Sequence, residues 1–336
     1  FVFDEKEYFK LNLKYFNHQM PDFKYIADNN LIIDNIYNKN LSELFSYEKK
    51  NSSNINFFTK NFASSVQKVY EYFFKIILKN VYKMNFSENL VFSGGCALNS
   101  SANRFLTNDN KYFKNVYIPF APGDNGGAIG AALVVSSKYV NKVDNLKSPY
   151  LGNKYSDQQV RDILESNKYK DKINSLLISN NDQMYLKAVN LIKDGNVIGW
   201  FQDRMEFGPR ALGNRSILAD PRNPQMKDII NSKIKRRESF RPFAPSILQK
   251  YQDDWVDCQF SSYYMSTIGK VKKEKSNLVP AITHIDGSAR FQTVNLGMNQ
   301  KFYYLIEKFY KITGVPIVLN TSFNENEPIV MRPEEA

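Results

Sequence analysis

The chain has 336 residues, of which 43% are hydrophobic, so it can bury the cores of two domains of ~150 residues each. No apolar run approaches the ~20 residues that cross a bilayer, and the beginning lacks the basic-then-apolar order of a signal peptide, which argues against a membrane or exported protein. Two cysteines, Cys96 and Cys258, argue against a disulfide framework and favour a reducing, cytoplasmic compartment.

The positive charge is concentrated in one part of the chain. The net charge is +11, and residues 201–250 hold 11 Lys and Arg against 5 Asp and Glu, which is more than half of the excess. An evenly spread surplus would carry little information, whereas this concentration predicts an anionic partner, either a polyphosphate or a nucleic acid.

The first half predicts strands that lead through glycine turns into helices. Apolar residues at helical spacing predict an amphipathic helix over 59–84. The segment "NLVFSGGCALNSSANRFL" at 89–106 predicts a strand, a glycine turn and a helix. The strand "NVYIPF" at 115–120 then leads through "APGDNGG" into another helix. Glycines at such turns let backbone come close to a ligand.

The second half predicts a connector followed by a second α/β unit. Residues 137–181 lack a clear period, apart from a short helix over 157–166 behind a Ser156 or Asp157 cap. The later expected elements are helix 182–194, strand 196–201, an arginine-rich loop, a helix near 224–234, helix 299–313 closed by Gly314, and strand 315–320. This alternation of strands and helices favours α/β architecture in both halves.

The two glycine turns, "SGGCALN" and "PGDNGGAIGAA", each offer exposed N–H groups before a helix. Such a turn can seat a phosphate or an adenosine, although the spacing is neither a Walker A loop nor GxGxxG. Tight turns without a ligand are the alternative. Asp124, followed by Asn125 and two glycines, suits a metal ligand or a ribose contact, and an Asx turn or N-cap competes with that interpretation.

Arginines are unusually dense in "FQDRMEFGPRALGNRSILADPR", residues 201–222. Their spacing fits neither a helix face nor strand alternation, and arginine is the residue that holds phosphate in a planar, bidentate way. We therefore expect the four arginines to lie on an irregular loop and to converge on phosphates. Downstream, Lys233 and Arg236 fit a solvated surface, whereas Arg241 lies in a hydrophobic, proline-fixed context in which a charge needs a partner.

Two further segments add polar groups near this site. "THIDGSARFQTV" at 283–294 contains His284, which is either a catalyst or a hydrogen-bonded structural residue. "NTSFN" at 320–324 places polar groups directly after a buried strand, where ligands of open α/β sheets bind. Together with the arginines these segments predict a site for an anionic, polyphosphate-type substrate.

Six motifs in order resemble one family. They are "FSGGCALN", "PGDNGGAIGAA", "WFQDRMEFGPRALGNRSILADPR", "KRRESFRPFAP", "HIDGSARFQTV" and "GVPIVLNTSFNENEPIV". Together they resemble the O-carbamoyltransferases of antibiotic and nodulation-factor biosynthesis, across almost the whole chain. The long arginine motif is the most specific of the six.

The resemblance implies an α/β protein with two domains. Residues 1–140 are similar to the C-terminal lobe of an actin/Hsp70-like (ASKHA) domain that transfers the carbamoyl group, with the N-terminal lobe expected to be missing from this chain. Residues 141–180 form a connector, and 181–336 resemble a YrdC-like domain. Such enzymes make carbamoyl adenylate from carbamoyl phosphate and ATP, and then carbamoylate a hydroxyl of a sugar or natural-product acceptor.

The resemblance also assigns residues. Lys235 and Arg237 match the K-x-R of YrdC-like domains, and with Arg210 and Arg241 they would grip ATP and carbamoyl phosphate. His284 is added to these catalytic residues. The residues expected to bind the adenylate and the ATP are Gly94, Gly95, Asn99, Asn125, Gly126, Arg204, Arg290, Asn320, Ser322 and Asn324, of which Ser322 and Asn324 match the family's S-x-N.

The metals follow from the resemblance as well. Mg²⁺ would accompany ATP, and Asp124 matches the family's iron-ligand aspartate. The family completes its Fe²⁺ site with an N-terminal histidine pair, whereas this chain has only His18 and His284. The resemblance therefore does not carry an iron site over to this chain, which should activate a carbamoyl group better than it transfers one.

Two other functions stay open at this stage. A tRNA acceptor, as in (threonyl)carbamoyl-adenylate enzymes, would fit the +11 charge. However, the charge lies in motifs with a small-molecule explanation, and no aromatic-and-basic stripe predicts RNA stacking, so nucleic acid is disfavoured. A non-catalytic nucleotide- or nucleic-acid-binding module would bind ATP without turnover. The acceptor and the oligomeric state are not encoded in any motif.

Overall fold

The computed structural model describes residues 10–20, 25–28, 30–33, 35–45, 57–140, 146, 148–166, 168–170 and 172–336. The chain divides into two compact units, Phe1–Phe86 and Ser87–Ala336. The second unit contains both the glycine-rich and the arginine-rich segments. The predicted boundaries at residues 140 and 181 stay predictions.

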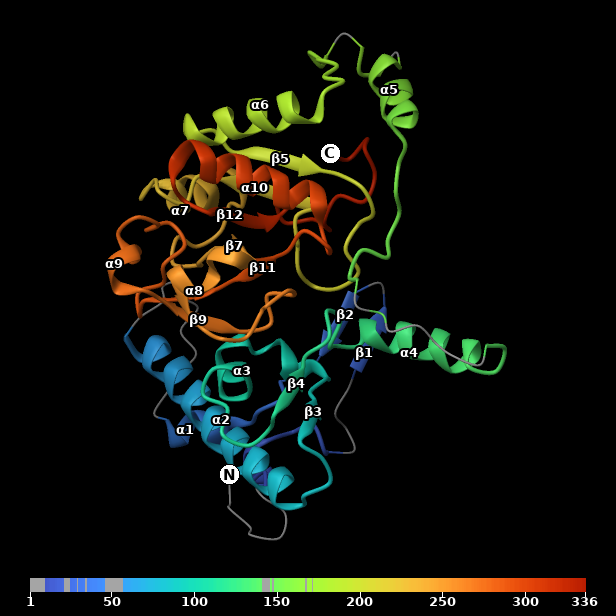
Figure 1. Cartoon of the computed structure of the whole chain (residues 1–336). Helices are drawn as coiled ribbons and strands as arrows, with labels where there is room; N and C mark the ends of the chain where they lie inside the picture. The colour runs from blue at the N-terminus through green and yellow to red at the C-terminus, as the bar shows by residue number, and fades with distance from the viewer. Residues whose placement is uncertain are drawn as a thin grey trace. The chain divides into compact units, whose positions relative to one another are not determined.

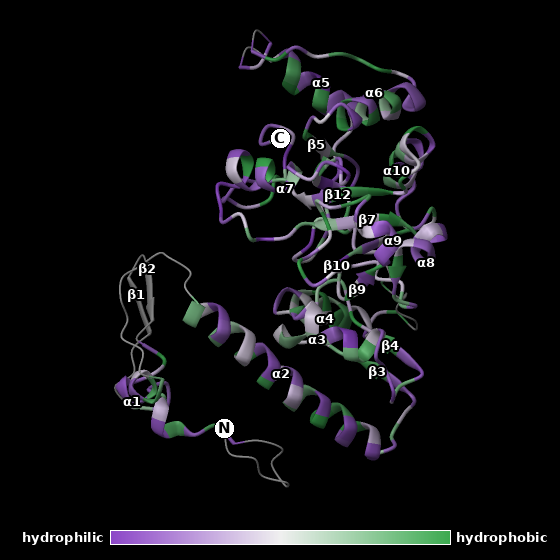
Figure 2. Ribbon diagram, turned by 90° about the vertical axis from the view of Figure 1, so that its left-hand side faces the viewer, coloured by the Kyte–Doolittle hydropathy of each residue, from purple (hydrophilic) through white to green (hydrophobic). Residues whose placement is uncertain are grey.

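The first unit contains a long helix and a small hairpin. Its elements are a 3₁₀ turn η1 (Leu13–Tyr15), β1 (Tyr25–Asp28), β2 (Asn30–Ile33), α1 (Lys39–Leu44) and α2 (Phe57–Lys83). β1 and β2 pair antiparallel. The helix predicted over 59–84 is confirmed as α2, along which hydrophobic and polar residues recur in turn (Figure 2).

The glycine-rich segment of the second unit has the predicted strand–turn–helix order. β3 (Asn89–Val91) runs parallel to β4 (Asn115–Tyr117). A 3₁₀ turn η2 (Gly95–Leu98) and α3 (Ser100–Thr107) follow β3, and α4 (Asn125–Ser136) follows β4. Gly94 has φ of 95°, which favours glycine, and its N–H donates to the carbonyl of Pro122 at 2.6 Å, so the two glycine turns lie against each other.

The short helix of the connector is confirmed as α5 (Asp157–Glu165). The Ser156 hydroxyl accepts from the backbone N–H of Gln159, and the Gln159 side chain accepts from the backbone N–H of Ser156. This capping box satisfies N–H groups that a helix start leaves without a partner.

Among the described residues of the second unit, the largest sheet is mixed and has five strands (Figure 1). Its strand order is β11-β7-β12-β6-β5, in which β11 and β7 are parallel and the other neighbours antiparallel. The elements are α6 (Asn181–Lys193), β5 (Ile198–Phe201), β6 (Arg215–Ala219), β7 (Ala244–Leu248), β11 (Gln292–Val294), α10 (Gln300–Thr313) and β12 (Ile317–Ser322).

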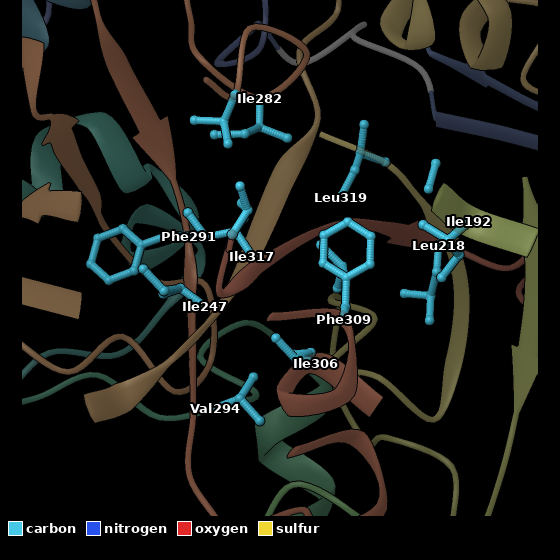
Figure 3. Packing of buried hydrophobic residues seen from close by; sticks show 14 of the residues in the cluster. Ile192, Leu218, Ile247, Ile282, Phe291, Val294, Ile306, Phe309, Ile317 and Leu319 are labelled. Atoms are coloured by element: carbon cyan, nitrogen blue, oxygen red, sulfur yellow. The ribbon is translucent and has the colours of Figure 1, made fainter. Parts of the chain in front are cut away.

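Two helices pack side by side on this sheet, α6 against β5 and β6, and α10 against β7 and β12. Ile306 and Phe309 of α10 are fully buried near Leu218, Ile317 and Leu319 of the strands (Figure 3). Burying each such side chain contributes about 1.5–3 kcal/mol. The predicted closure of α10 by Gly314 is confirmed, since Gly314 has φ of 74°.

The second unit also contains a smaller antiparallel sheet with the strand order β10-β9-β8. Its strands are β8 (Val256–Asp257), β9 (Ile268–Val271) and β10 (Ser288–Arg290). The short turns η4 (Gln249–Tyr251) and α8 (Gln252–Trp255) precede β8, and α9 (Lys273–Ser276) lies between β9 and β10. β10 and β11 are separated by Phe291 alone, so one segment joins the two sheets and shares a core with both.

The expectation that all of 201–222 is an irregular loop is wrong. Residues 215–219 form β6, which lies between β12 and β5, and all five are buried. A strand covered on both faces lacks alternation, and the arginine at its start concealed it. The helix near 224–234 exists, as α7 (Met226–Ile229) followed by a π-helical turn η3 (Ile230–Ile234).

The architecture is therefore mixed α/β, as expected, with a sheet that is mostly antiparallel. Within the described part of the chain, no helix combines the length and the apolar character needed to cross a membrane.

The backbone at residue 208 approaches residue 120 so closely that glycine should be required more strictly at 208 than at 195. Gly208 and Gly195 both have positive φ, but a Cβ at 208 would lie 2.5 Å from the carbonyl oxygen of Phe120, whereas a Cβ at 195 would meet nothing within 4 Å. Gly195→Ala should lower the free energy of unfolding by about 1–2 kcal/mol. Gly208→Ala should lower it by more, because two backbone segments must also separate.

Urea unfolding of both variants and the wild type checks this. Equal losses for the two variants would contradict the close packing of the 208 loop on the glycine-rich segment.

Candidate functional site

A cavity of about 160 Å³ lies where three segments of the second unit meet. The loop after β5, the start of β7 and the end of β12 form most of its wall. Its lining residues are Pro209, Arg210, Ala211, Arg237, Pro242, Phe243, Ala244, Met265, Arg290, Asn320, Thr321 and Ser322. The cavity thus brings together five of the predicted site residues, those at 210, 237, 290, 320 and 322.

Three guanidinium groups line this cavity, and no carboxylate does. Burial, with the charges of Arg210 and Arg237, lowers the pKa of Arg290 to about 9. Burial also lowers the pKa of Arg210, and burial and the charge of Arg241 lower that of Arg237. Like charges held together and partly shielded from water favour an anion that binds between them.

Glu206 shapes the loop that carries Arg210. Its buried Oε1 accepts from the backbone N–H groups of Leu212 at 2.6 Å, Asn214 at 2.8 Å and Arg215 at 3.4 Å. Burial raises the pKa of Glu206, and these backbone hydrogen bonds oppose the rise. One oxygen that collects three donors folds residues 212–215 back toward 206, which leaves residues 209–211 at the cavity.

The other arginines of 201–222 do not converge on this cavity. Arg215 is fully buried, lies 3.5 Å from the centre of the Phe201 ring, and donates to the carbonyls of Asp203 and Asn214. Its role is structural. The prediction that the four arginines share one phosphate site is therefore wrong, because a charge can also be satisfied by carbonyls that surround it.

Arg204 and Arg222 also have partners within the chain. Arg222 pairs with the buried carboxylate of Asp220 at 2.6 Å, which raises the pKa of Arg222. Arg204 donates to the carbonyl of Gly152 at 3.2 Å, outside the cavity lining. The cofactor-binding role assigned to Arg204 stays a prediction.

Lys235 ties the S-x-N segment together. The lysine is 2% exposed, and its Nζ donates to the carbonyls of Ser322 and Asn324, both at 2.6 Å, and to Asn324 Oδ1 at 2.9 Å. Burial and the charge of Arg237 lower the pKa of Lys235 to about 8, while Glu327 opposes the shift. The structure thus brings the predicted K-x-R and S-x-N residues into direct contact, with the lysine behind the cavity wall.

Arg237 is held in the cavity by two neighbours. Its Nε donates to Asn231 Oδ1 at 2.8 Å, and its guanidinium lies 5.0 Å from the centre of the Phe243 ring. Asn231 belongs to the π-helical turn η3, a type of turn that recurs at functional sites. Arg241, in contrast, is half exposed and pairs with Glu238 at 2.8 Å, so its expected partner is a surface carboxylate.

His284 lies in a short hydrogen-bonded chain outside the cavity lining. Ser288 Oγ donates to Asp286 Oδ1 at 2.6 Å, and it lies 3.1 Å from His284 Nδ1. Burial lowers the pKa of His284, and Arg290 and Lys227 act in the same direction against Asp286. These hydrogen bonds end at Ser288, two residues before Arg290, so the turn positions the start of β10. Catalysis by His284 stays a prediction.

The glycine-turn residues border the other side of the Arg210 loop. A second, smaller cavity of about 10 Å³ is lined by residues of both segments: Ala97, Leu98, Pro119, Phe120, Pro122, Pro209, Arg210, Tyr264, Met265 and Ser266. Arg210 thus lines both cavities. Asn99 caps α3 by accepting from the N–H of Ala102 at 3.2 Å, and a Cβ at Gly126 would lie 2.2 Å from the carbonyl oxygen of Ala121.

Asp124 is exposed at the start of α4 and makes no capping hydrogen bond. Within the ranges that the structure describes, no three His, Cys, Asp or Glu side chains gather in a way that could hold a metal ion. The roles assigned to Gly94, Gly95, Asn99, Asn125 and Gly126 stay predictions.

Three supporting residues were missed by the sequence interpretation. They are Glu206, Asn231 and Ser246, which fix the loop, Arg237 and Asn320 respectively. Glu206 could have been noticed from the sequence, because it is an acidic residue inside a strongly basic motif. Asn231 and Ser246 carry no such signal, because each acts through a contact distant in sequence.

Removing the Glu206 acceptor should loosen the loop. Glu206→Ala leaves buried N–H groups without a partner, and each costs about 1–3 kcal/mol, so the free energy of unfolding should fall by about 2–5 kcal/mol. Glu206→Gln keeps an oxygen at the same place and should lose less than half as much. Urea unfolding measures both, and equal losses would contradict the assigned role of Oε1.

Comparisons with known proteins agree with this arrangement of motifs. A family model described as Carbamoyltransferase N-terminus matches residues 5–133, and one described as Carbamoyltransferase C-terminus matches residues 189–336. The N-terminal match covers the first glycine-rich motifs, and the C-terminal match covers the arginine cavity.

Curated relatives align over most of the chain. Nodulation protein NolO of Bradyrhizobium diazoefficiens is 38% identical over 82% of this chain and 51% of its own length. Nodulation protein NolNO of Sinorhizobium fredii is 40% identical over 81% of this chain and 40% of its own length. The Uncharacterized protein sll1178 of Synechocystis is 38% identical over 98% of this chain and 55% of its own length.

The chain therefore spans about half the length of the curated relatives it matches. The two family models follow each other in the order N-terminus, C-terminus and together cover most of the residues. On these matches, the chain belongs to the carbamoyltransferase family.

Proposed function

We propose that this chain is the part of an ATP-dependent O-carbamoyltransferase that activates the carbamoyl group as carbamoyl adenylate. The single observation that carries the proposal is the cavity that three partly buried arginines line without a carboxylate. In a carbamoyltransferase, the anion that such a cavity suits is the phosphate of carbamoyl phosphate or of ATP. The whole protein would then carbamoylate a hydroxyl of a small-molecule acceptor.

The proposed reaction has two half-reactions. Water cleaves carbamoyl phosphate to carbamate and inorganic phosphate, and a carbamate oxygen then attacks the α-phosphorus of ATP while the bond to pyrophosphate breaks. Afterwards the acceptor hydroxyl oxygen attacks the carbamoyl carbon, AMP leaves, and the hydroxyl proton passes to a base. Arg210, Arg237 and Arg290 would neutralise the charge that develops on phosphate in the first half-reaction.

The remaining assignments are part of the same proposal. Residues 181–336 would form a YrdC-like domain, and 1–140 part of an ASKHA-type domain whose glycine turns hold the adenylate. Lys235 would act through Ser322 and Asn324, which it binds directly. Mg²⁺ would enter with ATP. The described residues around Asp124 do not fit an iron site, and no step is assigned to iron.

Removal of one cavity charge should abolish activation. The wild type should release pyrophosphate from ATP only when carbamoyl phosphate is present. Arg210→Ala should lower this rate about 10²–10³-fold, because a preorganised donor to the developing charge is lost. Lys233→Ala is the matched control, because it removes a positive charge from an exposed residue of the same basic region.

Pyrophosphate release that does not depend on carbamoyl phosphate would contradict the donor assignment. An unchanged rate in Arg210→Ala would contradict the assignment of the cavity.

Anion binding should weaken as pH rises through about 8. The Lys235 ammonium, with its pKa lowered to about 8, loses its charge in that range, while the phosphates of ATP stay ionised. The dissociation constant of ATP should rise about three- to tenfold between about pH 7 and pH 9. Lys235→Met should bind weakly at both pH values and with a smaller dependence, because only Arg290, with its pKa lowered to about 9, still loses charge in this range. Titration calorimetry checks this, and an unaltered pH profile in the variant would assign the dependence elsewhere.

A further inference from the structure

The predicted connector is attached to the loop that carries Arg210. Residues 149–153 of the connector lie beside residues 205–207, near the start of that loop. Three backbone hydrogen bonds join the two segments: the N–H of Gly152 donates to the carbonyl of Met205 at 2.9 Å, the N–H of Met205 to Asn153 at 3.0 Å, and the N–H of Phe207 to Pro149 at 2.7 Å. Because several bonds join them, a shift of the connector must also shift the loop.

Two consecutive connector residues hold both ends of the stretch 208–211. Pro149 accepts from the N–H of Phe207, just before the stretch. Tyr150 donates its hydroxyl proton to the carbonyl of Leu212, just after the stretch, at 3.0 Å. The residues at 209, 210 and 211 line the arginine cavity. The two contacts with the connector therefore limit where this part of the cavity wall can lie.

The Tyr150 hydroxyl both donates and accepts. Burial and the charge of Glu206 raise the pKa of Tyr150, so the hydroxyl keeps the proton that it donates to Leu212. It also accepts from Nδ2 of Asn299 at 3.0 Å, and Asn299 caps the start of α10. Through Tyr150 the loop is thus joined to the connector and to a helix that packs on the five-stranded sheet.

Two arginines that do not line the cavity hold the connector on the loop. Arg204 donates to the carbonyl of Gly152 at 3.2 Å, and Arg215 donates to the carbonyl of Asn153 at 3.4 Å. The arginine motif therefore contains contacts to the connector as well as a residue, Arg210, that lines the cavity.

We propose that the connector supports the anion site and that Tyr150 is a positioning residue, which orients Arg210 by holding the loop at Leu212. This inference rests on the proposed function, because it takes the cavity as the place where Arg210 binds phosphate. Tyr150 does not line the cavity, so it acts on an anion through the loop. A binding group that is fixed before its ligand arrives loses less freedom on binding, which raises the affinity.

Tyr150→Phe removes the hydroxyl and keeps the ring. The neighbours of the hydroxyl retain other partners, since the Leu212 carbonyl still accepts from Gln292, and Asn299 still donates to Asn214. The variant should therefore fold, and its effect on the site can be measured.

A double-mutant cycle with pyrophosphate as the probe tests the inference. Titration calorimetry on the whole chain, without divalent cations, should show that Tyr150→Phe raises the dissociation constant about three- to tenfold. Arg210→Ala should raise it about 10- to 100-fold, with Arg237 and Arg290 still in the cavity wall. In the Arg210→Ala background, Tyr150→Phe should change it less than about twofold, because the residue acts through Arg210.

The chain offers a matched control in Tyr263. This tyrosine packs against the same apolar cluster as Tyr150, but its hydroxyl accepts from Gln249 at 3.0 Å. Tyr263→Phe should leave the dissociation constant of pyrophosphate within about twofold of the wild-type value. An equal loss of affinity in Tyr263→Phe and Tyr150→Phe would overturn the role given to Tyr150.

The other outcomes separate this inference from the proposed function. An unchanged affinity in Tyr150→Phe, beside a weakened Arg210→Ala, would overturn the inference and leave the proposed function standing. An equal effect of Tyr150→Phe in both backgrounds would also overturn it, since the residue would then not act through Arg210. If the wild type does not bind pyrophosphate, or if Arg210→Ala binds it as tightly, the inference falls together with the proposed function.

Discussion

Repulsion among the three partly buried guanidinium groups of the cavity is the constraint on which the proposed site depends. Burial disfavours the charged form of such a group, and the positive charges of Arg210 and Arg237 add to that cost, so both lower the pKa of Arg290. Two of the three are placed without a carboxylate in the cavity: Arg237 by the amide of Asn231, and Arg210 by a loop that the Oε1 of Glu206 holds through backbone N–H groups. The protein thus keeps its carboxylates out of the cavity, where they would compete with an anionic substrate.

The contrast with the neighbouring arginines supports this interpretation. Arg222 lies on a buried carboxylate, and Arg215 is enclosed by backbone carbonyls and an aromatic ring, so their charges are satisfied within the chain. Arg210 and Arg290 lack such partners among the described residues that line the cavity. The arginines therefore fall into two groups. Some stabilise the fold through partners within the chain, and others line the cavity and are free to bind a ligand.

The sequence predicted local features well, because capping and periodicity are local. The helix behind Ser156 and the stop at Gly314 appear where their side-chain and backbone chemistry requires. The arginine motif was harder to interpret, since its spacing does not say which guanidinium meets a carbonyl 12 residues away, as Arg215 meets Asp203. β6 was not predicted because all five of its residues are buried, so the strand lacks alternation, and it begins with an arginine. Contacts made only in the folded chain decide the role of each charge.

The structure of the chain bound to phosphonoacetamide, a stable analogue of carbamoyl phosphate, tests the central claim most directly. If the cavity is the donor site, the phosphonate oxygens should lie within hydrogen-bond distance of Arg210, Arg237 and Arg290. Binding of the analogue at any other place, with the three guanidinium groups still facing an unfilled cavity, would contradict the account.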